Sequence, residues 1–273
     1  MSFNRDIQLD PNRVQTRSGG GRGAVIGGGS VLTVIAVVLI SQLTGVDLTS
    51  MLGAQQQTGT TTSTASSIDT SVCTSGDSAN KYTQCRMVAT AESLDAVWTE
   101  QLPAQAGLKY AKPEFVLWDG TQISSACGNA SSAVGPFYCS GDRTVYLDMS
   151  FFSEMERSLG AADTPLAEEY IVAHEFGHHI QHLTGQMAKA DRSGSGATSD
   201  SVRLELQADC YAGIWVNHAS STPDPDTGKP FLNRPSSEEI KGALGAAEAV
   251  GDDHIQERAP FACDVASHPT VDS

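Results

Sequence analysis

The amino-acid sequence predicts an α+β fold, and two patterns carry that prediction. Short apolar runs typical of strands, residues 114–118 (EFVLW) and 144–148 (TVYLD), precede a series of helical patterns. Runs of strands followed by runs of helices are typical of the α+β class. Apolar residues make up 40% of the 273, which is enough for a sizeable core. The net charge of −15 would repel the phosphates of a nucleic acid, so we expect no such partner.

The N-terminal region has the pattern of a membrane anchor. Residues 24–43 (AVIGGGSVLTVIAVVLISQL) contain no charged side chain, and about twenty apolar residues can cross a bilayer as a helix. Arg13, Arg17 and Arg22 precede this run, and basic residues stay on the cytoplasmic side. The sequence therefore predicts a cytoplasmic basic N-terminus over residues 1–23, a single-pass transmembrane helix in the cell membrane, and an extracytoplasmic remainder. A cleaved signal peptide is the alternative, which the lack of an Ala-x-Ala-type site after the run disfavours.

The chain after the anchor divides into a linker and one domain. Residues 44–80 are dominated by Gln, Thr, Ser and Gly, a composition that cannot offset its ordering entropy and predicts a flexible polar tether. Residues 81–273 then form one domain of ordinary size.

Six cysteines favour an oxidising compartment over a cytosol, where thiols stay reduced. The simplest pairing closes two short local loops and joins the two cysteines that are left: Cys73 with Cys85, Cys127 with Cys139, and Cys210 with Cys263.

Within the domain, further helices can be placed around the two strands. Residues 82–102 carry apolar side chains at helical spacing and should end before Pro103. Residues 128–142, between the strands, are rich in loop-forming residues. Three more helices follow from start and stop signals: a long one between the Thr164-Pro165 pair and Gly185, one over residues 201–217, and one over residues 236–250 with a Ser236 and Glu239 capping box.

The long helix contains the motif that indicates chemistry, His174-Glu175-x-x-His178. Residues four apart lie on one face of a helix, so His174 and His178 can bind one zinc ion while Glu175 reaches a water that the metal activates. Zinc lowers the pKa of that water towards 7, and the carboxylate accepts its proton. A solvated His-rich face is the alternative, and it leaves Glu175 unexplained among apolar neighbours.

The third ligand has several candidates on the same helix, and none fits. His182 lies about 12 Å along the helix from His174, so these two residues cannot bind the same ion. His179 points about 100° round the helix from His178, so it is expected either to pack or to support the ligands without binding the metal. Gln181 and Thr184 stand where a metzincin would need glycine and histidine.

The next helix offers a carboxylate pair four residues apart, Glu205 and Asp209. Two histidines and a glutamate with an open fourth position form a known catalytic zinc site. Asp209, one turn on, can accept a hydrogen bond from the free ring nitrogen of a ligating histidine. We therefore predict Glu205 as the third ligand of a single Zn²⁺ and Asp209 as the residue that orients a ligand. The alternative is an ordinary solvated acidic pair, which the apolar residues around it disfavour.

These segments also carry a resemblance to a known family. The chain resembles the bacterial putative neutral zinc metallopeptidase family in segments that occur in the family's order: 135–139 (GPFYC), 144–148 (TVYLD), 173–181 (AHEFGHHIQ), 202–215 (VRLELQADCYAGIW) and 251–256 (GDDHIQ). The resemblance implies a zincin-like, gluzincin-type hydrolase domain anchored in the membrane. It also implies His174, His178 and Glu205 as zinc ligands and Glu175 as the general base.

Two classes of function follow from these expectations. The first is an active metallopeptidase that cleaves peptide or protein substrates outside the membrane. The second is a zinc-binding surface interaction or assembly module with little or no proteolysis. Glu175 favours the enzyme, because a structural site needs no carboxylate beside its ligands and is usually closed by four protein ligands.

The end of the chain raises an expectation about turnover. Members of the resembled family continue into a Ser-Phe-Thr-His-Gly-like segment that would begin near Ser273. The histidine and arginine of that continuation are candidate donors to the oxyanion, and within the present chain only His254 or Tyr211 could replace them. We therefore expect zinc binding but slow turnover. The alternative is that the continuation only packs on the domain and adds stability.

Overall fold

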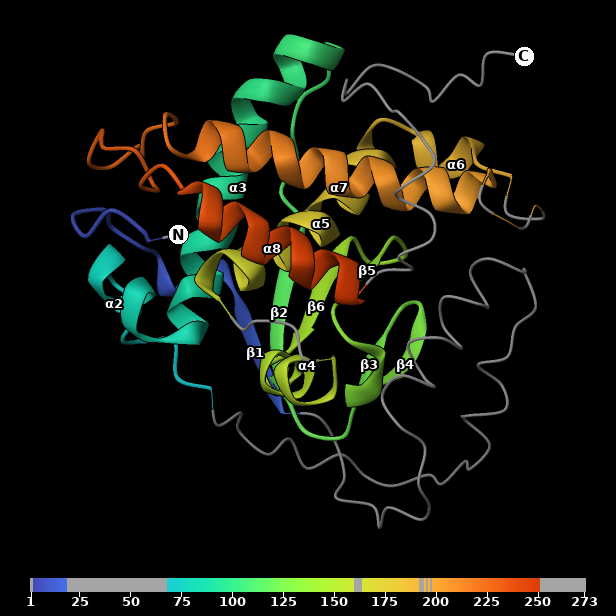
Figure 1. The fold of residues 1–273 in the computed structure, drawn as a ribbon, viewed down its shortest axis with the longest axis horizontal. Helices are drawn as coiled ribbons and strands as arrows, with labels where there is room; N and C mark the ends of the chain where they lie inside the picture. Colours follow the sequence, from blue (N-terminus) through green and yellow to red (C-terminus); the bar gives the residue numbers. More distant parts are fainter. Residues whose placement is uncertain are drawn as a thin grey trace.

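The structure, a computed structural model, describes residues 2–18, 68–159, 164–191, 194, 196 and 198–250 (Figure 1). The strands are β1 (Gln15–Ser18), β2 (Glu114–Asp119), β3 (Gln122–Ser125), β4 (Gly128–Ser131), β5 (Phe137–Cys139) and β6 (Thr144–Asp148). The α-helices are α2 (Gly76–Lys81), α3 (Thr83–Ala106), α4 (Phe151–Leu159), α5 (Pro165–Leu183), α6 (Gln186–Lys189), α7 (Asp200–Ala219) and α8 (Ser237–Val250). No helix among the described residues is long and apolar enough to cross a membrane. The anchor expected over residues 24–43 lies outside them.

The main sheet, together with the helices packed on it, confirms the α+β prediction. Its strand order is β1-β2-β6-β5, with β1, β2 and β6 parallel and β5 as the antiparallel edge strand. Phe115 and Leu117 of β2 belong to the main core shared with the helices, whereas Val116 and Trp118 pack with the β3–β4 hairpin on the other face. A strand buried on both faces reads as a continuous apolar run, which is why residues 114–118 were recognisable in the sequence.

Helix α5 is the centre of the helical layer and packs against α3, α7 and α8. The Thr164 side chain caps its first turn by accepting a hydrogen bond from the backbone N–H of Ala167. Pro165 stands at the first helical position, where its missing N–H leaves no bond unmade. Beyond the last turn, Gly185 takes the left-handed conformation, with φ of 75°. The start and stop signals of this helix are confirmed.

Helix α8 also begins as predicted, whereas α3 ends later. Ser236 and Glu239 form the expected capping box, in which each side chain accepts a hydrogen bond from the backbone N–H of the other. Helix α3 runs through Pro103 and ends at Ala106, where Gly107 caps it by donating its N–H to the Pro103 carbonyl. Because Pro103 lies in the last turn, its missing N–H removes one hydrogen bond without ending the helix earlier.

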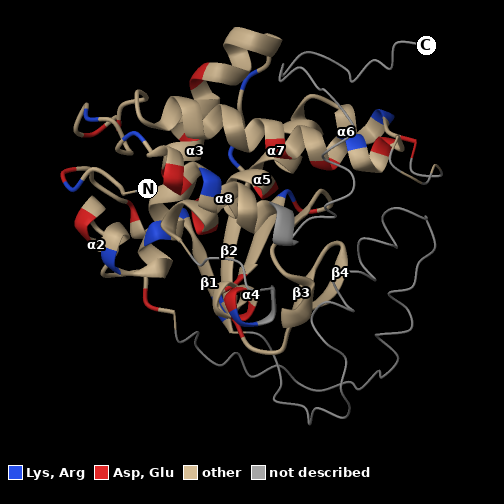
Figure 2. Ribbon diagram, viewed as in Figure 1, with Lys and Arg blue, Asp and Glu red and all other residues tan. Residues whose placement is uncertain are grey.

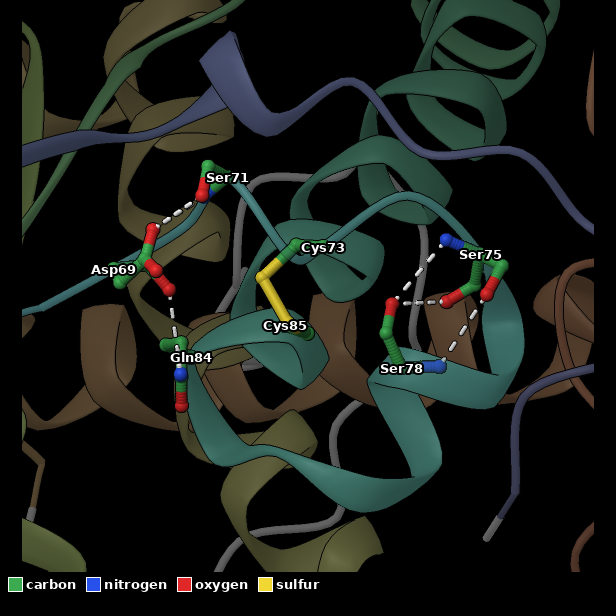
Figure 3. Close-up of a disulfide and its surroundings, with 7 residues drawn as sticks. All are labelled: Asp69, Ser71, Cys73, Ser75, Ser78, Gln84 and Cys85. Carbon is green, nitrogen blue, oxygen red and sulfur yellow. Dashed lines mark hydrogen bonds between the residues drawn. A yellow bond between two sulfur atoms is a disulfide. The ribbon is translucent and has the colours of Figure 1, made fainter.

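The folded domain begins before residue 81, where the sequence placed its boundary. Residues 2–18, expected as part of a separate N-terminus, pack on the domain and bury Phe3, Ile7, Leu9 and Val14. These apolar residues follow neither a helical nor a strand period, so their pattern gave no signal of burial. Residues 68–80, expected as part of the tether, are held by the Cys73–Cys85 disulfide (Figure 3).

The disulfide predictions hold for the two local bridges. Cys73–Cys85 and Cys127–Cys139 are both present. Cys210 is also disulfide-bonded, and its predicted partner Cys263 lies outside the described residues.

One carboxyl group inside the helical layer makes stability depend on pH. Glu169 of α5 is fully buried, and neither of its carboxylate oxygens has a hydrogen-bond partner. Burial raises the pKa of this carboxyl well above its usual value, although Arg86 opposes the rise; Glu168 and Glu239 add to it. A raised pKa in the folded state means that stability is lost as the pH rises above the unfolded value of about 4.3.

We therefore predict that Glu169→Gln stabilises the protein at pH 8 but has little effect near pH 4. The difference in the free energy of unfolding between the variant and the parent should grow with pH by up to about 1.4 kcal/mol per pH unit. It should stop growing when the buried carboxyl of the folded parent ionises. Urea unfolding at several pH values measures it, with the exposed Glu156→Gln as the control. A difference in the free energy of unfolding that does not change with pH would contradict the prediction.

Candidate metal centre

The candidate site forms where α5 and α7 approach each other closely. Gly177, between the two histidines of the motif, has no side chain to separate the helices. A Cβ at this position would lie 2.9 Å from the Ala208 carbonyl oxygen and 3.0 Å from the Ala208 Cα. Both helices carry acidic residues (Figure 2), and the close approach brings Glu205 and Asp209 of α7 to the histidines of α5.

Three side chains converge on one point in this region. His174, His178 and Glu205 each offer one ligand atom, and the three atoms lie within 4.8 Å of one another. The Glu205 Oε2 atom is 3.2 Å from His174 Nε2 and 3.4 Å from His178 Nε2. Two ligands bound at about 2.0–2.1 Å in a tetrahedron are separated by about 3.3 Å, so the spacing fits a zinc ion.

Hydrogen bonds at the other ring nitrogen fix the orientation of both histidines. His174 Nδ1–H donates to Asp209 Oδ1 at 2.8 Å, and His178 Nδ1–H donates to Gln181 Oε1 at 3.0 Å. The Gln181 amide is itself oriented, because its NH₂ group donates to the Leu204 carbonyl at 2.5 Å. In the neutral imidazoles the Nε2 lone pairs therefore face the Glu205 carboxylate, an arrangement that a cation between them would satisfy.

The electrostatics of the cluster favour positive charge. Burial lowers the pKa of His174, but the hydrogen bond to Asp209 and the charges of Asp209 and Glu205 outweigh it and raise the pKa well above its usual value. Burial raises the pKa of Glu205, but the two imidazoles outweigh it and hold the pKa far below its usual range. A metal cation would balance the negative charge held here.

Glu175 lies beside the cluster, in a different environment. It is 9% exposed, and its carboxylate accepts a hydrogen bond from the backbone N–H of Tyr138 on β5. Burial raises the pKa of this carboxyl although the neighbouring imidazoles lower it. A carboxylate with a raised pKa is a better proton acceptor.

His179 contacts Tyr138, the residue whose backbone holds Glu175. Its Nε2–H donates to the Ala111 carbonyl at 2.7 Å, and its Nδ1 accepts from the Tyr138 hydroxyl at 3.0 Å. Burial lowers the pKa of His179 to about 4, so the ring is neutral, as both bonds require. His179 therefore packs, as predicted, and His182 does not join the metal-ligand cluster.

The structure also places residues that sequence reasoning missed or misjudged. Tyr170 donates its hydroxyl to Asp209, at 3.2 Å from the carbonyl and 3.4 Å from Oδ1. Gln181 could have been suspected from its place one turn after His178, whereas nothing in the sequence points to Tyr138. The proposed oxyanion donor Tyr211 lies in the core against the ring of Trp98, and the other, His254, lies outside the described residues.

Comparison with known proteins identifies the family. The model of the putative neutral zinc metallopeptidase family matches residues 6–270. The chain belongs to this family. An uncharacterized protein of Mycobacterium tuberculosis, Rv2575, is 46% identical over 218 residues, which cover 80% of this chain and 72% of that protein. The uncharacterized protein YpfJ of Escherichia coli is 36% identical over 235 residues, which cover 83% and 73% of the two chains.

The name of the family indicates a zinc peptidase. Both relatives are uncharacterized, so neither supplies an established activity. No solved structure matches the chain significantly. The roles of the individual residues therefore rest on the geometry of the site.

We predict that Gly177→Ala separates α5 from α7 and damages the site. The added methyl group would press on the backbone of Ala208, which cannot rotate away, so the free energy of unfolding should fall by about 1–3 kcal/mol and zinc retention should weaken. Gly213→Ala is the matched control, since Gly213 lies inside the facing helix α7 and a Cβ at this position meets no atom within 4 Å. Thermal unfolding and metal analysis measure both, and equal zinc retention in the two variants would contradict the prediction.

Proposed function

We propose that this protein is a zinc-dependent peptidase in which His174, His178 and Glu205 hold one Zn²⁺ and Glu175 is the general base. The observation that carries the proposal is the convergence of two imidazole Nε2 atoms on one carboxylate oxygen, at 3.2 and 3.4 Å. The donor set of two nitrogens and one oxygen is typical of catalytic zinc.

The residues around the proposed zinc ligands each have a definite task in this proposal. When bound, zinc would supply a Lewis acid that lowers the pKa of water and polarises a peptide carbonyl. Glu175, held by the Tyr138 N–H, takes the proton from the attacking water onto its carboxylate and passes it to the leaving amine. Asp209 and Gln181 keep the two histidines in the tautomer whose Nε2 is free to bind a metal.

A zinc-binding interaction module remains the second candidate, and the exposure of the site argues against it. The Glu205 side chain is 45% exposed, and the described residues bring three metal-ligating side chains together. A structural zinc site is usually closed by four ligands, whereas a catalytic one keeps an open position. The two local disulfides support a location in an oxidising compartment, which fits a peptidase acting outside the cytosol.

The proposal predicts that two carboxylate substitutions have different effects. Glu205→Ala should lose zinc during dialysis, because it removes a ligand. Glu175→Gln should keep zinc but lose most of the turnover that the parent shows on a peptide library, because it removes the base. Metal analysis and chelator-sensitive cleavage measure these effects. A zinc content in Glu205→Ala equal to that of the parent would reject the ligand set, and a zinc-loaded parent that cleaves no peptide would favour the interaction module.

Removing the charge that orients His174 should also weaken the site. We expect Asp209→Asn to lower zinc affinity by roughly 10–100-fold, the usual effect of losing the partner of a ligating imidazole. Competition with a chromogenic chelator measures the affinity. The control is Asp200→Asn, on the same helix but paired with Arg203. Equal affinities in the two variants would return Asp209 to the solvated-pair interpretation.

A further inference from the structure

The N-terminal segment, residues 2–18, is bound to the domain along its whole length. Several of its backbone N–H groups donate to the domain, among them those of Asn4 to the Phe231 carbonyl at 2.8 Å, Gln8 to the Asp224 carboxylate at 3.1 Å, and Asp10 to the Glu92 carboxyl group at 2.6 Å. At its end, β1 adds a parallel strand to β2 (Figure 1). The segment is therefore part of the sheet and of the core.

The domain surface is shaped to receive this segment. Gly76, at the start of α2, lies so close to the segment that a Cβ there would overlap the Asn4 carbonyl oxygen at 1.8 Å. Asn80 of α2 holds Phe3 from both sides, since its side chain accepts from the Phe3 N–H and donates to the Phe3 carbonyl. Phe3 itself is 1% exposed.

A buried ion pair ties the segment to the centre of the domain. Arg13 donates to both carboxylate oxygens of Asp95, at 2.6 and 3.1 Å, and both side chains are less than 10% exposed. The Tyr110 hydroxyl donates to the same carboxylate at 2.9 Å. The Arg13 guanidinium also lies over the ring of Phe176 in α5, 5.8 Å from its centroid. Without Arg13 the domain would keep a buried carboxylate whose remaining cationic partner, Lys112, is mostly exposed.

We infer that residues 2–18 and 68–250 lie on the same side of the membrane, the oxidising side. An edge strand, a buried ion pair and four buried apolar side chains cannot be shared between parts of a chain held apart by a bilayer of about 30 Å. The disulfides of residues 68–250 place the domain where thiols are oxidised. The inference replaces the cytoplasmic N-terminus expected from the basic residues. It also means that the chain leaves residue 18 and returns at residue 68 on the same side of the membrane.

Arg13, one of the basic residues on which the cytoplasmic placement rested, has its partner inside the folded domain. It is paired with the buried carboxylate of Asp95. The positive-inside rule counts Lys and Arg residues near a membrane span and takes no account of such pairs in the fold.

A cysteine pair across β1 and β2 tests the inference in the full chain. Ser18 and Asp119 are neighbours in the parallel register, and strands about 4.8 Å apart lie within the range of a disulfide. Ser18→Cys with Asp119→Cys, expressed in cells and alkylated before lysis, should form an additional bridge, detected by mass spectrometry of a non-reduced digest. Ser18→Cys with Ala188→Cys is the matched control, because α6 lies across the molecule from β1 (Figure 1). A bridge in the first pair alone is the expected result, and two free thiols in both pairs would overturn the inference.

A second measurement does not depend on bridge geometry. Asn12→Cys and Glu100→Cys place single exposed thiols on the segment and on the domain. A membrane-impermeant maleimide should label both in intact cells to the same extent as after lysis. Labelling of Glu100→Cys in intact cells with Asn12→Cys protected until lysis would restore the cytoplasmic N-terminus. Protection of both until lysis would overturn the assignment to the oxidising side.

Discussion

The close approach of α5 and α7 is the constraint on which the candidate site depends. Gly177 lets the backbone of Ala208 come within contact distance, so residues within one turn of this contact on either helix meet across the interface. Glu205 then reaches the Nε2 atoms of the two histidines, and Asp209 reaches the Nδ1 atom of His174. A bulkier residue between the two histidines would leave the motif intact in sequence while removing its third ligand in space.

Around this contact, hydrogen bonds determine what each ring can do. Three imidazoles on α5, those of His174, His178 and His179, have at least one ring nitrogen hydrogen-bonded to a partner, but the consequences differ. His174 and His178 donate from Nδ1 and keep Nε2 towards Glu205. His179 uses both nitrogens, on the Ala111 carbonyl and the Tyr138 hydroxyl, and has none left for a metal. The same residue type therefore serves as ligand or support according to its partners.

The sequence predicted the parts of this structure that depend on local spacing. The two buried strands, the caps of α5 and α8, and the two short-loop disulfides each depend on residues a few positions apart. The i, i+4 pairs on α5 and α7 likewise selected the residues that the structure brings together.

The features that escaped prediction depend on contacts between distant segments. Tyr138 reaches Glu175 from another element, and its side chain gives no sign of this because the bond comes from the backbone. The N-terminal segment lacks any periodic pattern, and its binding depends on Asp95 and Gly76, more than sixty positions away. Arg13, one of the basic residues that the sequence assigned to the cytoplasm, therefore has its partner inside the fold.

The proposed ligand set requires His174, His178 and Glu205 to bind a single zinc ion. A crystal of the zinc-loaded protein, measured on both sides of the zinc absorption edge, tests it most directly. We expect one anomalous peak within bonding distance of both Nε2 atoms and the Glu205 carboxylate, at about 2.0–2.2 Å from each. A peak held by other side chains, or a zinc-loaded crystal with no peak between α5 and α7, would contradict it.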